Sequence, residues 1–168
     1  KRADFCGIPI CERSVERDAQ HRPGQIINDF PWKAKRVTDR IQELNSLLAS
    51  IKRDRSELSR SDYENRTSDW AGKLSETWER LIRSEIIYRV VDRSTTEVRP
   101  MMVRILAKIT DADYNEFLAG YSAASTWARR HDKSEEVSYV APEPDQMESE
   151  IDRLAATEKR IHKYSQQK

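Results

Sequence analysis

The sequence predicts an all-α protein, and three observations support that prediction. Between Val37 and Ile51, apolar residues recur at alternating intervals of four and three, as on a helix that packs against another helix. A second helical stripe runs from Trp70 to Tyr88 without a proline. The 168 residues include four glycines and six prolines, and 35% are charged. Such a composition suits long exposed helices and leaves few turn residues for a β-sandwich or a doubly wound sheet.

We therefore expect an elongated helical bundle of roughly five or six helices, built around a long antiparallel helix pair that carries these two stripes. The seam of the first stripe spans only two heptads, so it fits a coiled coil and a helix packed on one neighbour equally well.

Residues 1–31 are expected to be an irregular N-terminal segment, followed by a helical domain at residues 32–168. Three prolines and two glycines punctuate the segment, and no period of 2 or 3.6 residues persists in it. Its apolar side chains, which we expect to pack on the body, are Phe5, Ile8, Ile10, Ile26, Ile27 and Phe30. Because the chain starts with Lys1 and not with methionine, we expect a fragment of a larger protein.

The first helix of the domain is predicted from Trp32 to about Arg53, with its polar face solvated. Residues 54–66 are almost wholly polar and predict a turn or a helix break. The second helix is expected to begin near Ser61 or Ser68 and to run to about Val91.

Three further helices are expected after that point. Residues 94–96 form a possible cap before a helix that contains Pro100. The apolar face of that helix is predicted to hold Val98, Met101, Met102, Ile105, Leu106 and Ile109. Residues 110–113 predict the cap of the next helix, in which Gly120 permits a close helix crossing. The last helix begins at Pro142 or Pro144, and its predicted core face holds Met147, Ile151, Leu154 and Ile161.

Composition excludes some classes of function. The net charge is +1, from 30 basic and 29 acidic residues, so binding to nucleic acid or to an anionic membrane would need a local patch. No run approaches the roughly 18 apolar residues of a membrane helix, and the first residues lack the apolar core of a signal peptide. Two cysteines do not make a disulfide framework. We therefore expect a cytoplasmic protein that does not associate with membranes.

Motifs for cofactors are absent from the sequence. The four glycines are isolated, so no Walker A loop can bind ATP here. Cys6, Cys11 and His21 have a loose spacing and no fourth ligand, which argues against a zinc site. We expect no metal and no cofactor.

Two acid/base candidates remain. His131 stands beside Arg130 and could move a proton near a phosphate; alternatively, both residues belong to a polar helix end that complements the helix dipole. Glu79 follows Trp78, where a buried carboxylate could be functional; alternatively, it forms a surface pair with Arg83.

The order of these pieces resembles the C-terminal region of SMC/ABC-like AAA-family ATPases of bacterial phage-defence loci, with PrrC/RloC-type anticodon nucleases as distant relatives. The pieces are Asp29-Phe30-Pro31-Trp32, Glu76-Thr77-Trp78-Glu79-Arg80, Val90-Val91-Asp92-Arg93, Ile109-Thr110-Asp111-Ala112-Asp113, Ser125-x5-His131-Asp132 and Pro142-Glu143-Pro144. The resemblance covers the chain from about residue 25 to its end and implies an ATP-binding head upstream.

Nuclease members of the wider group have HEPN-type helical bundles. The resemblance assigns Glu79 to their carboxylate position and His131 to their histidine position. Arg130 is the candidate cation, with Arg129 and Arg83 as alternatives. Two residues depart from the pattern. Ser75 stands where a basic residue is expected, and Ser125 stands where arginine or asparagine is expected.

Two functions follow from the resemblance. The first is a helical effector or partner-coupling module of a defence-type ATPase, which contacts the ATP-binding head, a protein partner or a second copy of itself. The alternative is a HEPN-type metal-independent ribonuclease that resembles the tRNA anticodon nucleases and binds RNA. Whether the chain is an enzyme stays open at this point.

Overall fold

The computed structural model describes residues 14–17, 20–27, 31–128 and 139–166. The chain divides into two compact units, Lys1–Arg36 and Val37–Lys168. The helical unit therefore begins five residues after the predicted boundary at residue 32.

The N-terminal unit contains a short antiparallel hairpin of β1 (Ser14–Arg17) and β2 (Pro23–Ile27), followed by the 3-10 turn η2 (Trp32–Ala34). Ser14 pairs with Ile27 and Val15 with Ile26. Val15 and Ile26 of the hairpin are exposed. Strands of four and five residues hold too few alternations for a period of two to stand out in the sequence.

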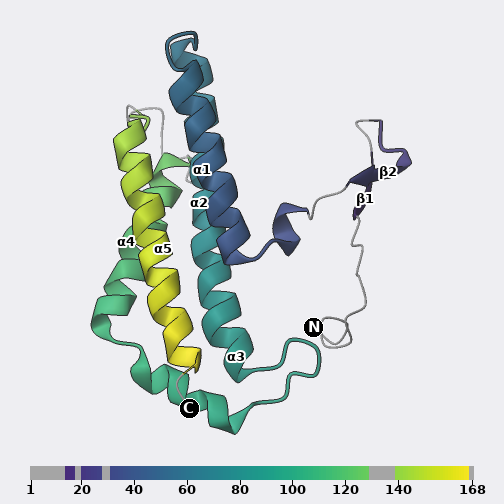
Figure 1. Cartoon of the computed structure of the whole chain (residues 1–168), viewed down its shortest axis with the longest axis vertical. Helices are drawn as coiled ribbons and strands as arrows, with labels where there is room; N and C mark the ends of the chain where they lie inside the picture. The colour runs from purple at the N-terminus through teal and green to yellow at the C-terminus, as the bar shows by residue number, and fades with distance from the viewer. Residues whose placement is uncertain (1–13, 18–19, 28–30, 129–138, 167–168) are drawn as a thin grey trace. The chain divides into compact units, whose positions relative to one another are not determined.

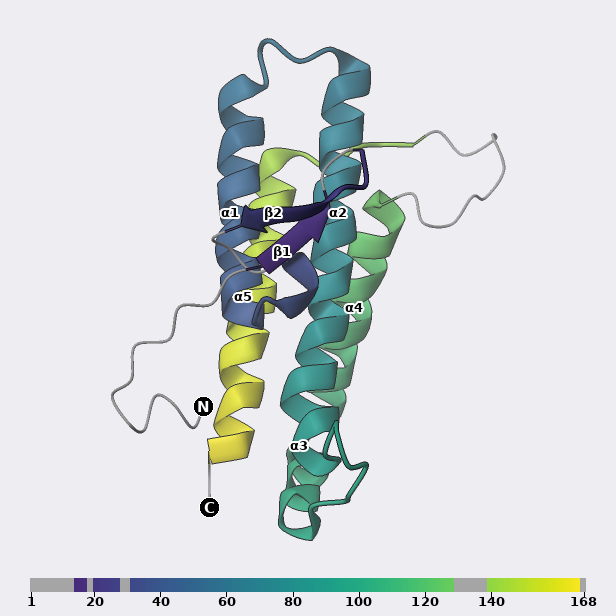
Figure 2. The ribbon, with the colours of Figure 1, turned by 90° about the vertical axis from the view of Figure 1, so that its right-hand side faces the viewer.

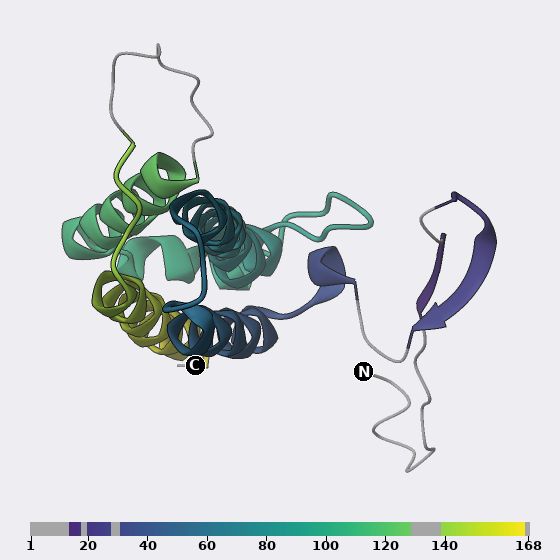
Figure 3. The ribbon, with the colours of Figure 1, turned by 90° about the horizontal axis from the view of Figure 1, so that it is seen from above.

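The helical unit confirms the all-α prediction. Its elements are α1 (Val37–Asp54), α2 (Arg60–Ile82), the π-helix η3 (Arg83–Ile87), α3 (Tyr88–Val90), the 3-10 helix η4 (Pro100–Lys108), α4 (Asp111–Trp127) and α5 (Pro144–Gln166). The long helices pack as a ring in which α1 contacts α2, α2 contacts α4, α4 contacts α5, and α5 contacts α1 (Figures 1 and 3). No described helix has the apolar length that a membrane crossing requires.

The predicted antiparallel pair is α1 with α2, joined by a short turn at one end of the unit (Figure 1). The first helix begins at Val37 and not at Trp32, because Lys35 adopts an extended conformation (ψ 143°) that ends the preceding 3-10 turn. Ser59 caps α2 by accepting a hydrogen bond from the Asp62 amide. The core residues of the pair are Val37, Leu44, Leu48, Ile51, Trp70, Leu74, Trp78 and Leu81.

One predicted core face is wrong. Of the six apolar residues expected to line the helix after Pro100, only Ile105 is buried. This helix, η4, lies across one end of the bundle (Figure 1) and has three residues per turn. Every third side chain therefore points inward, namely Met102, Ile105 and Lys108, and the others stay outside. The residues before it, 94–96, belong to a turn and not to a helix cap.

Helix α4 runs alongside α2 (Figure 2), and glycine permits the close crossing that we expected. The cap at residues 110–113 is confirmed as a capping box between Thr110 and Asp113. A β-carbon built at Gly120 would lie 2.3 Å from ring atoms of Trp78. The ring of Phe117 meets the same indole edge-on, with centroids 6.3 Å apart.

Alanine at position 120 should therefore destabilise the bundle by roughly 1–3 kcal/mol, because a fully buried indole cannot yield without moving its neighbours. The matched control is Gly72→Ala on α2, where a β-carbon would meet nothing within 4 Å. That change should be neutral or stabilise the protein by up to about 1 kcal/mol through helix propensity. Urea unfolding of both variants tests the contact. Equal stability of the two would show that Gly120 does not set the crossing.

Candidate functional site

The structure places one of the three predicted catalytic residues. Glu79 lies half-buried on α2. His131 and Arg130 lie outside the described residues, so their distance from Glu79 stays untested.

The two positions that depart from the HEPN pattern lie next to each other. Ser75 on α2 and Ser125 on α4 are both buried, and their hydroxyl oxygens are 3.5 Å apart. The helix that carries Glu79 is therefore packed on the helix that precedes His131 in the sequence. At this contact the chain holds two hydroxyls and no cation, so these two positions cannot neutralise a phosphate.

A polar cluster joins η3 to the last turns of α5. The Nδ1 atom of His162 lies 3.2 Å from Oε2 of Glu85, and NH2 of Arg89 donates to the same oxygen at 2.9 Å. Because a carboxylate only accepts, Nδ1 of His162 donates. The other ring nitrogen, Nε2, lies 3.1 Å from the side-chain amide nitrogen of Gln166. Burial alone would raise the pKa of Glu85, but the hydrogen bonds from Arg89 and His162 outweigh it and lower that pKa.

A second cluster surrounds Asp113 at the start of α4. This carboxylate is 1% exposed; Nε of Arg160 donates to it at 2.7 Å and the hydroxyl of Tyr164 at 3.2 Å. Thr110 supplies the capping hydrogen bonds. Burial would raise the pKa of Asp113, but the hydrogen bonds from Thr110 and Arg160 together lower it.

These two clusters form what we call the C-terminal clamp. Arg160, His162 and Tyr164 of α5 hold the start of α4 and the π-helix η3, and the ammonium group of Lys108 on η4 donates to the Tyr164 carbonyl at 3.2 Å. The last turns of α5 are thereby tied to three other elements. No local spacing in the sequence predicts the pairing of His162 with Glu85, because the two residues are 77 positions apart.

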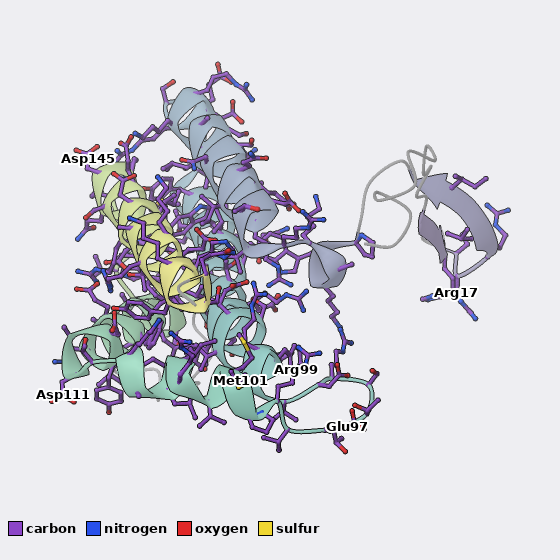
Figure 4. The ribbon with its side chains drawn as sticks, turned by 60° about the horizontal axis from the view of Figure 1, so that its bottom comes forward. Arg17, Glu97, Arg99, Met101, Asp111 and Asp145 are labelled. Carbon is purple, nitrogen blue, oxygen red and sulfur yellow. The ribbon has the colours of Figure 1, made fainter. Side chains whose placement is uncertain are left out.

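Six large apolar side chains of η4 and α4 are exposed, and we call them together the outer surface: Met101, Val103 and Leu106 of η4, and Tyr114, Leu118 and Tyr121 of α4. Met101 is 78% exposed and Tyr114 is 60% exposed. Figure 4 labels Met101 at one end of η4 and Asp111 beyond the other end, where α4 begins.

The charged residues of the outer surface differ between its two halves. Arg104 belongs to η4 and Asp111 to α4, and both are exposed. Within the described part of the chain, neither has an ion pair. Single exposed apolar residues are ordinary, whereas six on two consecutive elements make the outer surface the candidate docking region of the described residues.

Glu150 on α5 is a buried carboxylate of a different kind. One oxygen, Oε1, forms an ion pair with Arg153 at 2.9 Å, and the other, Oε2, has no hydrogen-bond partner among the described residues. Burial raises the pKa of Glu150. The described residues contain no group of three His, Cys, Asp or Glu side chains that could hold a metal. Cys6 and Cys11 lie outside those residues.

Searches of protein-family models, curated proteins and solved structures return no match to this chain. The resemblance to the defence ATPases therefore stays a prediction.

Asp113 and Glu150 should respond to pH with opposite signs. The native pKa of Asp113 lies below the ordinary 3.8, so its bonds stabilise the fold at neutral pH and are lost as the pH falls through that native pKa. Asp113→Asn should cost roughly 1–3 kcal/mol at neutral pH, and the cost should shrink in acid.

The native pKa of Glu150 lies above the ordinary 4.5, so its charged form opposes folding at neutral pH. Glu150→Gln should then be neutral or stabilising, with the difference vanishing in acid. The urea midpoints of both variants, measured from neutral to acidic pH, test the two predictions. A large loss of stability in Glu150→Gln at neutral pH would contradict the raised pKa of Glu150.

Proposed function

We propose that this chain is the helical C-terminal partner-coupling module of a bacterial defence-type ATPase. The observation that carries the proposal is the outer surface, which presents six large apolar side chains on η4 and α4. Interfaces are enriched in tyrosine and methionine and in apolar area at their centre. The resemblance of the sequence supplies the ATPase part of the proposal, and it implies that the ATP-binding head lies upstream.

The C-terminal clamp supports a coupling role. The two elements of the outer surface are tied to the last turns of α5 through Asp113 and Lys108. A molecule that binds the outer surface therefore acts on elements that are anchored to the far end of the chain. In this proposal the hydrogen bonds of Lys108 and Asp113 are the contacts through which η4 and α4 couple to α5.

The second candidate is a HEPN-type ribonuclease. The contact between Ser75 and Ser125 favours it, because it brings together the two helices on which the resemblance places Glu79 and His131. In this candidate His131 moves the 2′-hydroxyl proton and Arg130 holds the phosphate. The serines at the two departing positions are the observation against it, so the coupling module ranks first.

The gene itself offers the first test. The reading frame upstream of Lys1 should encode a P-loop with the pattern Gly-x4-Gly-Lys-Ser/Thr, because the proposed head must bind ATP. Sequencing the locus decides this point. A frame without a P-loop would remove the ATPase from the proposal.

Variants of the full-length protein separate the two candidate functions. If the module couples to a partner, Met101→Asp with Leu118→Asp should abolish phage protection in cells while ATP hydrolysis and RNA cleavage in vitro stay at wild-type levels. If it is a nuclease, Glu79→Gln and His131→Ala should each abolish RNA cleavage, since acid/base catalysis contributes about 10²–10⁴-fold. Val140→Asp is the control, because Val140 is 77% exposed and lies outside the outer surface. Full protection by the double aspartate variant would refute the coupling role.

A further inference from the structure

The two halves of the outer surface carry opposite charges. Residues 98–109, which include η4, contain three basic residues and no acidic one, whereas α4 contains three acidic residues and no basic one. Several of these charges are already paired within the chain. Asp113 binds Arg160, Glu116 lies 3.4 Å from Arg153, and Arg99 binds Asp92. Arg104 on η4 and Asp111 on α4 are the exposed charges that, among the described residues, have no ion pair.

We propose that a second copy of this chain covers the outer surface, with η4 of each copy packed on α4 of the other. This inference rests on the proposed function and names the partner of its docking surface. A two-fold axis makes every contact occur twice, so one chain supplies both complementary halves. Arg104 of each copy then lies near Asp111 of the other, while the apolar side chains of η4 meet Tyr114, Leu118 and Tyr121.

The charges select this pairing over the other two-fold arrangements. If η4 packed on η4, Arg104 would face a second Arg104 and the basic segments would repel. If α4 packed on α4, Asp111 would face a second Asp111. Like charges brought together at an interface oppose binding, and opposite charges fix its register. Of the three arrangements, the reciprocal pairing is the one that brings each unpaired charge to its opposite and covers apolar side chains of both η4 and α4.

The side chains of the outer surface are of the types that dimer interfaces favour. A stable dimer buries about 800 Å² per chain, with aromatic residues and methionine enriched at the centre. The outer surface supplies two tyrosines and one methionine, together with three aliphatic side chains. The tyrosines lie seven residues apart on α4 with Leu118 between them, a spacing of four and three that forms one straight helical stripe.

A charge swap on the complete 168-residue chain tests the pairing. The two variants are Arg104→Glu and Asp111→Lys, and sedimentation equilibrium measures the mass against 19.7 kDa for one chain. Wild type should form a dimer. Each variant alone should weaken dimerisation at least about tenfold, because both copies of the contact become repulsive. An equimolar mixture of the two variants should restore the dimer to near wild-type affinity, because both contacts in the mixed dimer are attractive again.

A matched control measures what a charge reversal in the first turn of a helix does to stability, apart from its effect on the dimer. Asp145 occupies the first turn of α5, as Asp111 does for α4, and Figure 4 labels both residues. Asp145→Lys should lower the thermal midpoint about as much as Asp111→Lys and leave the dimer intact. Leu118→Asp should abolish the dimer in every mixture, while its circular dichroism stays helical.

The outcomes are distinct from those that test the proposed function. A wild-type chain that is monomeric at about 100 µM, or a mixture of variants that stays monomeric, overturns the dimer. If the double aspartate variant still loses phage protection in that case, the docking function stands and a different protein occupies the surface. If the dimer forms and the same variant protects fully, the dimer stands and the coupling function fails.

Discussion

The close approach of Gly120 to the indole of Trp78 is the contact on which the arrangement of the helical unit depends. No side chain larger than hydrogen fits at position 120, because a β-carbon would lie 2.3 Å from the ring. Trp78 is fully buried, and its Nε1 atom has no hydrogen-bond partner among the described residues. The missing bond costs roughly 1–3 kcal/mol. Burying about 200 Å² of indole at ~25 cal/mol/Å² contributes roughly 5 kcal/mol, so packing of the ring prevails.

This contact decides which face of α4 points inward. The side of α4 that meets the bundle carries Gly120, Ala124 and Ser125, all of them small and buried. Tyr114, Leu118 and Tyr121 of the same helix lie on the outside, whereas Phe117 packs on the indole of Trp78. The neighbouring η4 has a period of three residues and also turns only one row of side chains inward. The outer surface is thus a consequence of how tightly α4 packs on α2.

Polar contacts then fix the elements that carry this surface. Asp113 caps α4 and binds Arg160, and Glu85 in the π-helix η3 binds His162. Both carboxylates are held below their ordinary pKa by the donors around them, against the effect of burial. Short π-helical segments often occur at functional sites, and this one forms part of the clamp between α5 and the outer surface. The proposed docking role therefore depends on a rigid support and on an exposed apolar face, which together suit coupling better than catalysis.

The sequence by itself determined the fold class, the antiparallel pair of α1 and α2, the capping box at Thr110 and the core face of α5. These features depend on helical period and on caps, which are local and visible within about ten residues. It also identified Gly120 as a possible close crossing. The sequence did not identify the partner of that glycine, the burial of Arg40 or the pairing of His162 with Glu85. The buried guanidinium of Arg40 donates to the Glu76 carbonyl at 3.0 Å.

Only the tertiary structure decided which apolar side of η4 and of α4 became core. Both elements carry apolar residues on their buried and on their exposed sides, and no local rule separates a side that packs from one that stays exposed. That choice depends on the 3-10 geometry of η4 and on the shape of Trp78, which lies 42 residues before Gly120 in the sequence. Contacts between residues so far apart are decided by the packing of the whole bundle, and for this reason the outer surface could not be predicted from the chain alone.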